Sequence, residues 1–397
     1  MSRRRRLQIA VSGSFKDYTC NPYTILGHHV AQRILPLINE KPMAIEELSA
    51  ELDLPEDMIK EHIEKMLSCR YVEEVQADSK TLYKPAFTIL TLEDQRRLQP
   101  LIEELSSDIA TVVAESMPKV REAIKQVRCI KAGYELPQTE YIVVVAYTLN
   151  LLASKALRDE GYVIEYKDMP GGSFIVSALE EGLVDLEDEW TWGNFDQYGE
   201  YVFASYGKAE IPWKVRSVFP DIAWFWKRVV GQSKVNKWVE RIGDILFELI
   251  DGSLPIRELA SRLQIDEIDL IRDLHILDDL EYVSIVGSGE NTRVELAAPI
   301  FSRSDIKLIR EAAKAICQGV VATLREKYSK IEDTYSKLSP ARNGIDLSEA
   351  LNAIYMLTRI MASRKLIEME VVKKPPIRRD GEEYTTWVAK VPWQDHL

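Results

Sequence analysis

The sequence is poor in cysteine. Four cysteines occur in 397 residues, widely spaced and without a Cys-x-x-Cys pair, so they form neither a zinc-ligand pattern nor a disulfide framework. We expect reduced, packed thiols at Cys20, Cys69, Cys129 and Cys317. A metal-sensing pair of cysteines assembled by the fold is the alternative. His28 and His29 are neighbours and point in different directions on a helix, so no metal site is predicted there.

Long hydrophobic runs are also absent. Tyr141–Leu152 is apolar but too short to span a bilayer, and Lys155 and Arg158 follow it. The basic run Arg3–Arg6 is not followed by a long apolar stretch, so no signal peptide is predicted. These absences favour a cytoplasmic protein that does not contact a membrane.

The common catalytic signatures are missing too. The chain has no Walker loop, no G-x-G-x-x-G, no H-E-x-x-H and no G-x-S-x-G motif. Its many acidic residues lie on predicted helix faces, where solvated charge is the default explanation. We therefore predict that the chain is not an enzyme and has no catalytic residues, no cofactor and no metal.

A repeated pattern is present. The segment Ile34–Val75 returns as Ile245–Val286 at a constant offset, by which Ile34 falls on Ile245. The apolar positions of the first segment fall on apolar positions of the second, and Tyr71-Val72 falls on Tyr282-Val283. The matched apolar positions in the first segment are Ile45, Leu48, Leu52, Leu54, Ile59, Ile63 and Met66. Recurrence at a fixed offset predicts the same domain twice. We call residues 34–90 the first repeat, residues 245–301 the second repeat, and the spacing between them the repeat offset.

Each repeat is expected to contain short helices followed by a hairpin. In the first repeat, the helices are Ile45–Glu51 and Met58–Cys69, separated by a turn at Leu54–Asp57, and the strands are Tyr71–Val75 and Thr81–Lys84. This pattern resembles the winged helix-turn-helix superfamily, in particular tandem ArsR- and MarR-like transcriptional regulators. The expected class is mainly α with small β wings (α+β), with duplicated winged helix-turn-helix domains joined by long helices and an aromatic-rich segment.

The remaining chain is divided around these repeats. Thr91–Val127 is amphipathic, begins with the N-cap pattern Thr91–Asp94, and is expected to break at Pro100 and Pro118. Strands are expected at 162–166, 173–178, 366–372 and 384–391, so a second wing-bearing module follows each repeat. The predicted domains are a basic arm (1–22), winged helix 1 (23–90), a helical spacer with a winged-like module (91–182), a Trp-rich connector (183–235), winged helix 2 (236–301), and a helical spacer with a C-terminal winged-like module (302–397).

The resemblance implies that double-stranded DNA is the partner, with the second helix of the motif in the major groove. Charge opposes this, because residues 45–75 contain ten acids and three bases and residues 256–286 contain eight acids and three bases. A clamp through the arm, the first winged helix and the last wing, expected over Lys373–Glu382, would use Arg3, Arg4, Arg5, Arg6, Lys60, Lys65, Lys80, Lys84, Lys373, Lys374, Arg378 and Arg379. A dispersed solvated surface and a disordered arm explain the same residues.

Aromatic residues gather in the connector. Six of the eight tryptophans lie between residues 190 and 238. Such a cluster can line an effector pocket between two lobes, or it can form a core that joins them. The candidate ligand-binding residues are Trp190, Trp192, Tyr198, Tyr201, Trp213, Trp224 and Trp226.

Two functions are therefore expected. The first is a DNA-binding transcriptional regulator, controlled by a small-molecule effector in the aromatic pocket. The alternative, favoured by the net charge of −12, is a protein-interaction or small-molecule-sequestering module that does not bind DNA. Either protein could be a monomeric pseudo-dimer or a homodimer.

Overall fold

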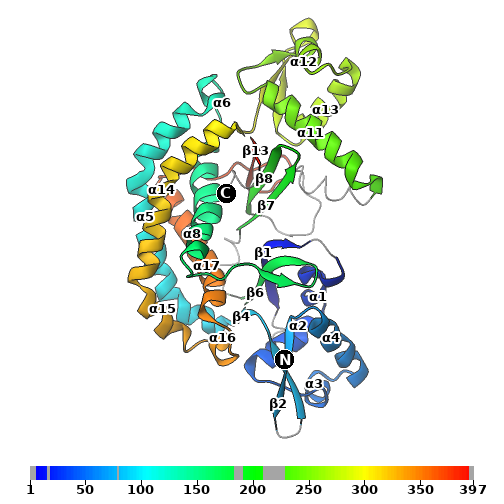
Figure 1. Cartoon of the computed structure of the whole chain (residues 1–397), viewed down its shortest axis with the longest axis vertical. Helices are drawn as coiled ribbons and strands as arrows, with labels where there is room; N and C mark the ends of the chain where they lie inside the picture. Colours follow the sequence, from blue (N-terminus) through cyan, green and yellow to red (C-terminus); the bar gives the residue numbers. More distant parts are fainter. Residues whose placement is uncertain (1–5, 16–17, 78–79, 183–190, 209–228, 393–397) are drawn as a thin grey trace. The chain divides into compact units, whose positions relative to one another are not determined.

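The computed structural model describes residues 6–15, 18–77, 80–182, 191–208 and 229–392 (Figure 1). They form two compact units, each assembled from three stretches of chain. Helices predominate and the strands form small sheets, which confirms a mainly α, α+β protein. Unit 1 contains residues 1–108, 156–188 and 321–361, and unit 2 contains residues 109–155, 189–320 and 362–397.

The first repeat lies in unit 1 and has the predicted helices and hairpin. The helices α3 and α4 pack against each other because their apolar positions fall on one face, with Ile59, Ile63 and Met66 fully buried. A short bridge between Met43 and Tyr83 adds a third extended segment to the hairpin. The elements are α2 (Ala31–Glu40), α3 (Ile45–Leu52), α4 (Glu56–Ser68), β2 (Val72–Ala77) and β3 (Lys80–Pro85).

The second repeat lies in unit 2 and has the same element order. Its hairpin strands pair antiparallel, and a short strand joins the outer side of β11, as the Met43 bridge does in the first repeat. The elements are α11 (Gln232–Glu248), β9 (Leu254–Pro255), α12 (Ile256–Leu263), α13 (Glu267–Asp279), β10 (Val283–Val286) and β11 (Arg293–Leu296).

Individual bonds recur at the repeat offset. The fully buried Tyr71 accepts the N–H of Ala86 with its carbonyl, and the fully buried Tyr282 accepts the N–H of Ala297. The turn after α3 has a left-handed residue at Asp53, and the turn after α12 has one at Gln264. The two segments therefore share backbone geometry as well as hydrophobic pattern.

The N-terminal arm expected over residues 1–22 is in large part ordered. Strand β1 (Leu7–Phe15) pairs antiparallel with β6 (Gly172–Glu180) in unit 1, and β4 (Thr88–Leu90) pairs with β6 in parallel. A 3-10 helix, η1 (Tyr18–Cys20), and helix α1 (Pro22–Leu26) lead into α2. The expectation of a free arm is wrong because the partner strand of β1 lies far along the chain, where no local pattern reveals it.

The wing-like strands after the first repeat also differ from the prediction. The first of them is β5 (Lys167–Met169), which begins later than the predicted 162–166. Its partner β6 does not project as a wing, because β1 and β4 cover both of its edges.

Part of the aromatic connector belongs to a sheet of unit 2. Strands β7 (Thr191–Tyr198) and β8 (Tyr201–Lys208) form a hairpin, β8 pairs antiparallel with β13 (Tyr384–Lys390), and β13 pairs in parallel with β12 (Ile300–Phe301). The strand arrangement β8–β13–β12 has the same directions as β1–β6–β4 in unit 1. Residues 191–208 are therefore part of a folded unit and not a linker.

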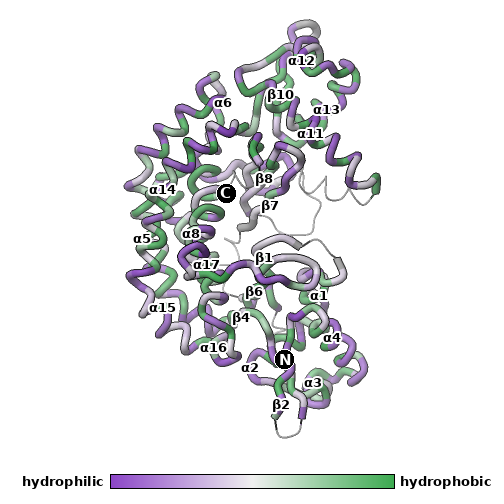
Figure 2. Tube along the Cα trace, viewed as in Figure 1, coloured by the Kyte–Doolittle hydropathy of each residue, from purple (hydrophilic) through white to green (hydrophobic). Residues whose placement is uncertain are grey.

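Long helices follow each repeat. Helix α5 (Leu92–Gln126) runs without interruption through Pro100 and Pro118, so the predicted breaks are wrong. Its buried stripe, which includes Leu98, Leu105 and Val113, stabilises the helix despite the missing proline donors. Figure 2 shows the alternation of hydrophobic and hydrophilic residues along α5 and α14 (Arg303–Glu326). The short helices α6 (Arg128–Lys131), α15 (Tyr328–Tyr335) and α16 (Ser339–Arg342) follow.

The apolar spacing of the sequence also predicts helices over Leu347–Arg364 and Thr139–Glu160. Helix α17 (Leu347–Glu368) continues past Arg364, so the extended segment predicted at 366–372 is wrong at its start. The run Thr139–Asp159 is helical as predicted and consists of α7 (Thr139–Tyr141), the π-helix η2 (Ile142–Leu152) and α8 (Ala153–Asp159). Among the described residues, this run alone has the length and hydropathy of a membrane span, and 67% of its apolar window is buried inside the fold.

A glycine faces an aromatic residue at matching places in the two sheets. Gly13 in β1 lies opposite Phe174, and Gly207 in β8 lies opposite Tyr384. A Cβ atom on Gly13 would lie 2.5 Å from the carbonyl oxygen of Ser173, and φ at Gly13 is +116°. Both positions need glycine because the partner strand leaves no room for a side chain.

We predict that Gly13→Ala lowers the free energy of unfolding of unit 1 by about 2–4 kcal/mol, through the clash and the positive φ. Urea denaturation followed by circular dichroism measures the loss. Gly161→Ala is the control in the same unit, because its φ is +76° but nothing lies within 4 Å of the new Cβ atom. The control should lose about 1 kcal/mol, and equal losses in the two variants would contradict the prediction.

Candidate interaction surface

The outward face of α4 and its hairpin is rich in carboxylates. Because Ile59, Ile63 and Met66 point into the core, the positions between them face solvent at helical spacing. Six exposed acids lie on α4 and β2: Glu56, Asp57, Glu61, Glu64, Glu73 and Glu74. We call these six residues the acidic face.

Most of this charge is not neutralised within the protein. Lys60 lies 3.9 Å from Glu64, and Lys84 lies 2.9 Å from Glu73. The other four acids, Glu56, Asp57, Glu61 and Glu74, make no ion pair within 4.0 Å among the described residues. The acidic face therefore carries net negative charge into solvent.

The corresponding helix in the second repeat is different. On α13, Glu267 pairs with Arg257 at 3.9 Å and Asp269 pairs with Arg272 at 3.2 Å. The buried Asp273 pairs with Arg241 at 2.7 Å and accepts the indole N–H of Trp238 at 3.1 Å. The carboxylates of α13 are thus largely satisfied by the chain itself.

Two of the basic residues predicted to contact DNA, near the end of the chain, bind groups of α13 and of the residues directly after it. Arg378 is 5% exposed, lies 2.9 Å from the Glu281 carboxylate, donates to the Leu280 carbonyl and lies over the Tyr384 ring. Arg379 donates to Asp278. This corrects the expectation that Arg378 contacts DNA, because its guanidinium is buried in unit 2.

The other predicted DNA-contacting residues are scattered. Arg3, Arg4 and Arg5 lie outside the described residues, and Arg6 lies 3.5 Å from Glu181. Lys65, Lys80 and Lys373 are exposed. Lys374 pairs with Glu383 at 2.8 Å, and Lys84 also donates to the Asn343 carbonyl at 2.7 Å.

The predicted aromatic pocket is only partly described. Tyr198 and Tyr201 are buried at the turn of the β7–β8 hairpin, and the Tyr201 hydroxyl donates to Asp244 of α11 at 2.6 Å. Burial raises the pKa of Tyr201 above its ordinary value, and the Asp244 carboxylate raises it further. The Tyr201–Asp244 bond fastens the hairpin to α11. The side chains of Trp190, Trp192, Trp213, Trp224 and Trp226 lie outside the described residues.

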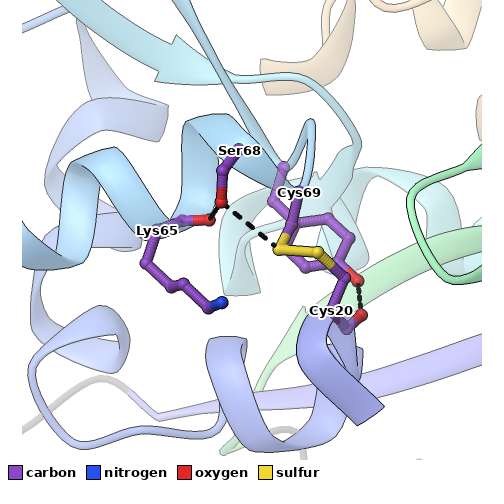
Figure 3. Close-up of a disulfide and its surroundings, with 5 residues drawn as sticks. Cys20, Lys65, Ser68 and Cys69 are labelled. Atoms are coloured by element: carbon purple, nitrogen blue, oxygen red, sulfur yellow. Dashed lines mark hydrogen bonds between the residues drawn. A yellow bond between two sulfur atoms is a disulfide. The ribbon is translucent and has the colours of Figure 1, made fainter. Parts of the chain in front are cut away.

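The cysteine prediction is wrong for two of the four residues. Cys20 and Cys69 form a disulfide bond that joins η1 to the end of α4 (Figure 3). The Tyr71 hydroxyl donates to the Cys20 carbonyl, and the Ser68 hydroxyl lies 3.7 Å from the Cys69 sulfur. A separation of 49 residues without a spacing motif gave no signal for this bond.

The other two cysteines are free thiols, as predicted. Burial raises the pKa of Cys129 to about 11 and that of Cys317 to about 12. Both thiols therefore remain protonated and unreactive near neutral pH.

Three histidines gather beside α4, which their sequence positions did not reveal. The His28 ring lies 4.4 Å from the His29 ring and is stacked 4.4 Å from the ring of His62. Among the described residues, no group of three or more histidine, cysteine or acidic side chains has the geometry to hold a metal ion. Burial, together with His28, lowers the pKa of His62 from its ordinary value of 6.5.

Comparison with known protein families, curated proteins and solved structures finds no match to this chain.

We predict that the free energy of unfolding falls as the pH is lowered through the region below 6.5. His62 has a depressed folded-state pKa, so the unfolded chain binds more protons there and acid favours unfolding. The His62→Gln variant should lose less stability than the wild type between about pH 7.5 and pH 5, as measured by urea denaturation. His275→Gln, at an exposed position on α13, is the control. The same slope in the wild type and in His62→Gln would exclude this role.

The neighbouring residues Arg378 and Arg379, of which only the first is buried, provide a second prediction. Arg378→Ala should destabilise unit 2 by about 3–5 kcal/mol, because it leaves the Glu281 carboxylate without its buried partner. Arg379→Ala, whose side chain is 55% exposed, should cost about 1 kcal/mol or less. Chemical denaturation measures both, and comparable losses would show that burial of Arg378 does not matter.

Proposed function

We propose that the chain contains two winged helix-turn-helix domains that arose by duplication. The helix–helix–hairpin order of the two repeats, the left-handed turn residues and the tyrosine carbonyl bonds all recur at the repeat offset. The winged-helix resemblance and the domain boundaries remain part of this proposal.

A reciprocal exchange between the halves supports the duplication. In unit 1, Asp94 accepts the N–H of Ser339 at 2.9 Å, and in unit 2, Asp305 accepts the N–H of Arg128 at 3.0 Å. The two acceptors are separated by the repeat offset, and so are the two donors. Each unit therefore uses a short helix from the other half of the chain, as two subunits of an intertwined dimer would.

At a second matching position the two repeats carry side chains of opposite charge, Arg70 and Glu281. In unit 1, Arg70 follows α4 and donates to the Asp168 carbonyl at 3.2 Å. In unit 2, Glu281 follows α13 and pairs with Arg378 at 2.9 Å. Arg70 and Glu281 have positive φ values of 58° and 54°. The same backbone joint thus tolerates either sign of charge.

We infer that the protein is a non-enzymatic interaction module, and that the acidic face of the first repeat binds a positively charged protein segment. The observation that carries this proposal is the contrast between unpaired acids on α4 and paired acids on α13. Because DNA binding depends on neutralising phosphates with lysine and arginine, the acidic face opposes DNA.

A DNA-binding regulator is the second candidate. Lys60, Lys65 and Lys80 are exposed on α4 and the hairpin, where a winged helix would meet DNA. Arg6 begins the described chain beside β1, directly after the three preceding arginines. A small-molecule effector would concern the connector alone, and the described part of the connector gives it no support.

We predict that the triple variant Glu56→Gln, Asp57→Asn, Glu61→Gln binds an arginine-rich dodecapeptide roughly tenfold more weakly than the wild type at low salt, because each exposed charge contributes a few tenths of a kcal/mol or more. Fluorescence anisotropy measures the affinity. The matched control is Glu267→Gln with Asp269→Asn on α13, whose acids are already paired and whose loss should have little effect.

The same proteins distinguish the two candidates when the probe is a DNA duplex of mixed sequence and about 20 base pairs, long enough for both major-groove half-sites. For a DNA-binding regulator, removing the three acids should strengthen binding, and Lys60→Ala, Lys65→Ala and Lys80→Ala together should weaken it. Tight duplex binding by the wild type with this pattern would reject the acidic-partner proposal.

A further inference from the structure

The exposed side of α14 carries a row of charges that is mostly positive. At the spacing i, i+3, i+4 and i+7, which follows one side of a helix, lie four exposed residues: Lys307, Arg310, Glu311 and Lys314. Lys307 and Lys314 have no carboxylate within 4.0 Å among the described residues. Lys119 of α5 donates to the Glu311 carbonyl at 3.3 Å and brings a further positive charge beside them. We call the four residues of α14 the α14 row.

The fold does not require the bases of the α14 row. At the repeat offset, they fall on three positions of α5 that together carry no net charge: Arg96, Gln99 and Glu103. Arg96 lies 4.0 Å from Glu93 on its own helix. Since α5 forms a long helix without such a row, the bases belong to the surface of α14 and not to its folding. This comparison rests on the duplication proposed above.

Helix α4 carries charges of mostly opposite sign at the same spacing. Its residues at i, i+3, i+4 and i+7 are all exposed: Asp57, Lys60, Glu61 and Glu64. We call them the α4 row, and its three acids belong to the acidic face. The signs along the α4 row are negative, positive, negative and negative. Along the α14 row they are positive, positive, negative and positive.

Two helices that face each other in parallel would pair these rows charge by charge. Each residue advances about 100° around the helix, so i and i+7 lie near the middle of a row and i+3 and i+4 lie on opposite sides of it. In a parallel pair, i meets i, i+7 meets i+7, and i+3 of each helix meets i+4 of the other. The resulting pairs are Asp57–Lys307, Lys60–Glu311, Glu61–Arg310 and Glu64–Lys314. All four join opposite charges.

An antiparallel pair would not have this complementarity. There, i+3 meets i+3 and i+4 meets i+4, so Lys60 would face Arg310 and Glu61 would face Glu311. Like charges in contact disfavour an arrangement and so fix the orientation of two surfaces. The pattern of signs therefore selects the parallel direction.

We propose that the α14 row of one molecule docks on the α4 row of a second copy of this chain, with the two helices parallel. The inference rests on the proposed function, in which the acidic face binds a positively charged protein segment, and it names that segment. On α4, Lys60 lies 3.9 Å from Glu64, an exposed pair that the contact between copies replaces.

A second copy matches both rows better than a polymer of one charge does. Lys60 lies among acids and is mismatched with a purely basic peptide, and Glu311 lies among bases and is mismatched with nucleic acid phosphates. Between two copies these residues face each other. The net charge of −12 opposes association at long range. At about 0.1 M salt, however, the Debye length of about 10 Å screens distant charges more than charges in contact.

Sedimentation equilibrium of the full chain measures the self-association. At about 0.1 M salt, the weight-average mass should rise with protein concentration. At about 0.5 M salt, where the Debye length is only about 4 Å, the association constant should be roughly tenfold lower. Circular dichroism checks that each substitution, all of them at exposed positions, leaves the fold intact.

Reversal of charge tests one pair of the contact. Asp57→Lys and Lys307→Glu should each lower the association constant about tenfold, because each puts like charges together. Both changes in one chain should restore it to within about threefold of the wild type. The single changes shift the net charge in opposite directions, so an effect of net charge alone would not weaken both. The matched control is Arg96→Glu on α5, which changes the net charge as Lys307→Glu does and should have no effect.

A second pair tests the direction of the helices. Lys60→Glu should weaken association when the helices are parallel, because the new carboxylate faces Glu311. In an antiparallel contact it would face Arg310 and strengthen association. Adding Glu311→Lys to Lys60→Glu should restore the wild-type association constant.

Three results would overturn the proposal: a wild-type mass that does not depend on concentration at about 0.1 M salt, reversed charges that do not compensate each other, or stronger association of Lys60→Glu. If the wild type stays monomeric and Lys307→Glu instead weakens binding of the DNA duplex, the α14 row is a nucleic acid site.

Failure of the proposed function would be distinguishable. Lys307→Glu leaves the acidic face unchanged and should bind the arginine-rich peptide as the wild type does. A chain that binds the peptide through the acidic face without self-association excludes only the contact between copies. A chain that binds neither the peptide nor a second copy excludes both.

Discussion

The buried carboxylate of Asp94 joins three elements that lie far apart in the sequence. One oxygen accepts the N–H and the hydroxyl of Thr91 at 2.9 and 2.8 Å, which fixes the start of α5 directly after β4. The other accepts the N–H of Ser339 at the start of α16. A carboxylate that is 2% exposed must have all its bonds satisfied, so the position of α16 is fixed as firmly as that of α5. Asp305 makes the same set of bonds to Ser302 and Arg128 in unit 2.

Because both carboxylates reach across the chain, neither half can complete its own unit. This requirement preserves backbone geometry and leaves the surface charge free to change. Arg70 and Glu281 illustrate this, since they occupy the same left-handed position with opposite charge. The acids of α13 are matched by Arg241, Arg257 and Arg272, but most acids of α4 have no such partner among the described residues. Under the proposed duplication, the first repeat kept an open charged surface and the second became internal support.

The sequence alone predicted the elements whose determinants lie close together in the chain. The spacing of Ile59, Ile63 and Met66 predicted α4, and Thr91-x-x-Asp94 predicted the start of α5. The same local patterns did not predict features that depend on residues far away in the sequence. Nothing near Cys20 indicates Cys69, and nothing in the neighbours Arg378 and Arg379 indicates that only the first is buried.

Pro100 and Pro118 are the opposite case. Their low helix propensity predicted breaks, but burial of the apolar stripe of α5 stabilises one continuous helix. Of the predicted DNA-contacting residues, Lys60, Lys65 and Lys80 could be placed on the exposed surface from helix and hairpin periodicity alone. Whether these lysines outweigh the surrounding acids depends on which acids are already in ion pairs, and only the folded structure shows those pairs.

Comparison of the two repeats also distinguishes features that the fold requires from features that it allows to vary. Features that both share, such as the buried tyrosines and the left-handed turns, follow from packing and backbone geometry. Features found in one alone cannot be requirements of that geometry, because the other repeat folds without them. The disulfide at Cys69, where the second repeat has Leu280, and the unpaired acids of α4 both belong to this class. Both lie on the same helix of the first repeat, and this coincidence favours a functional surface on α4 and not on α13.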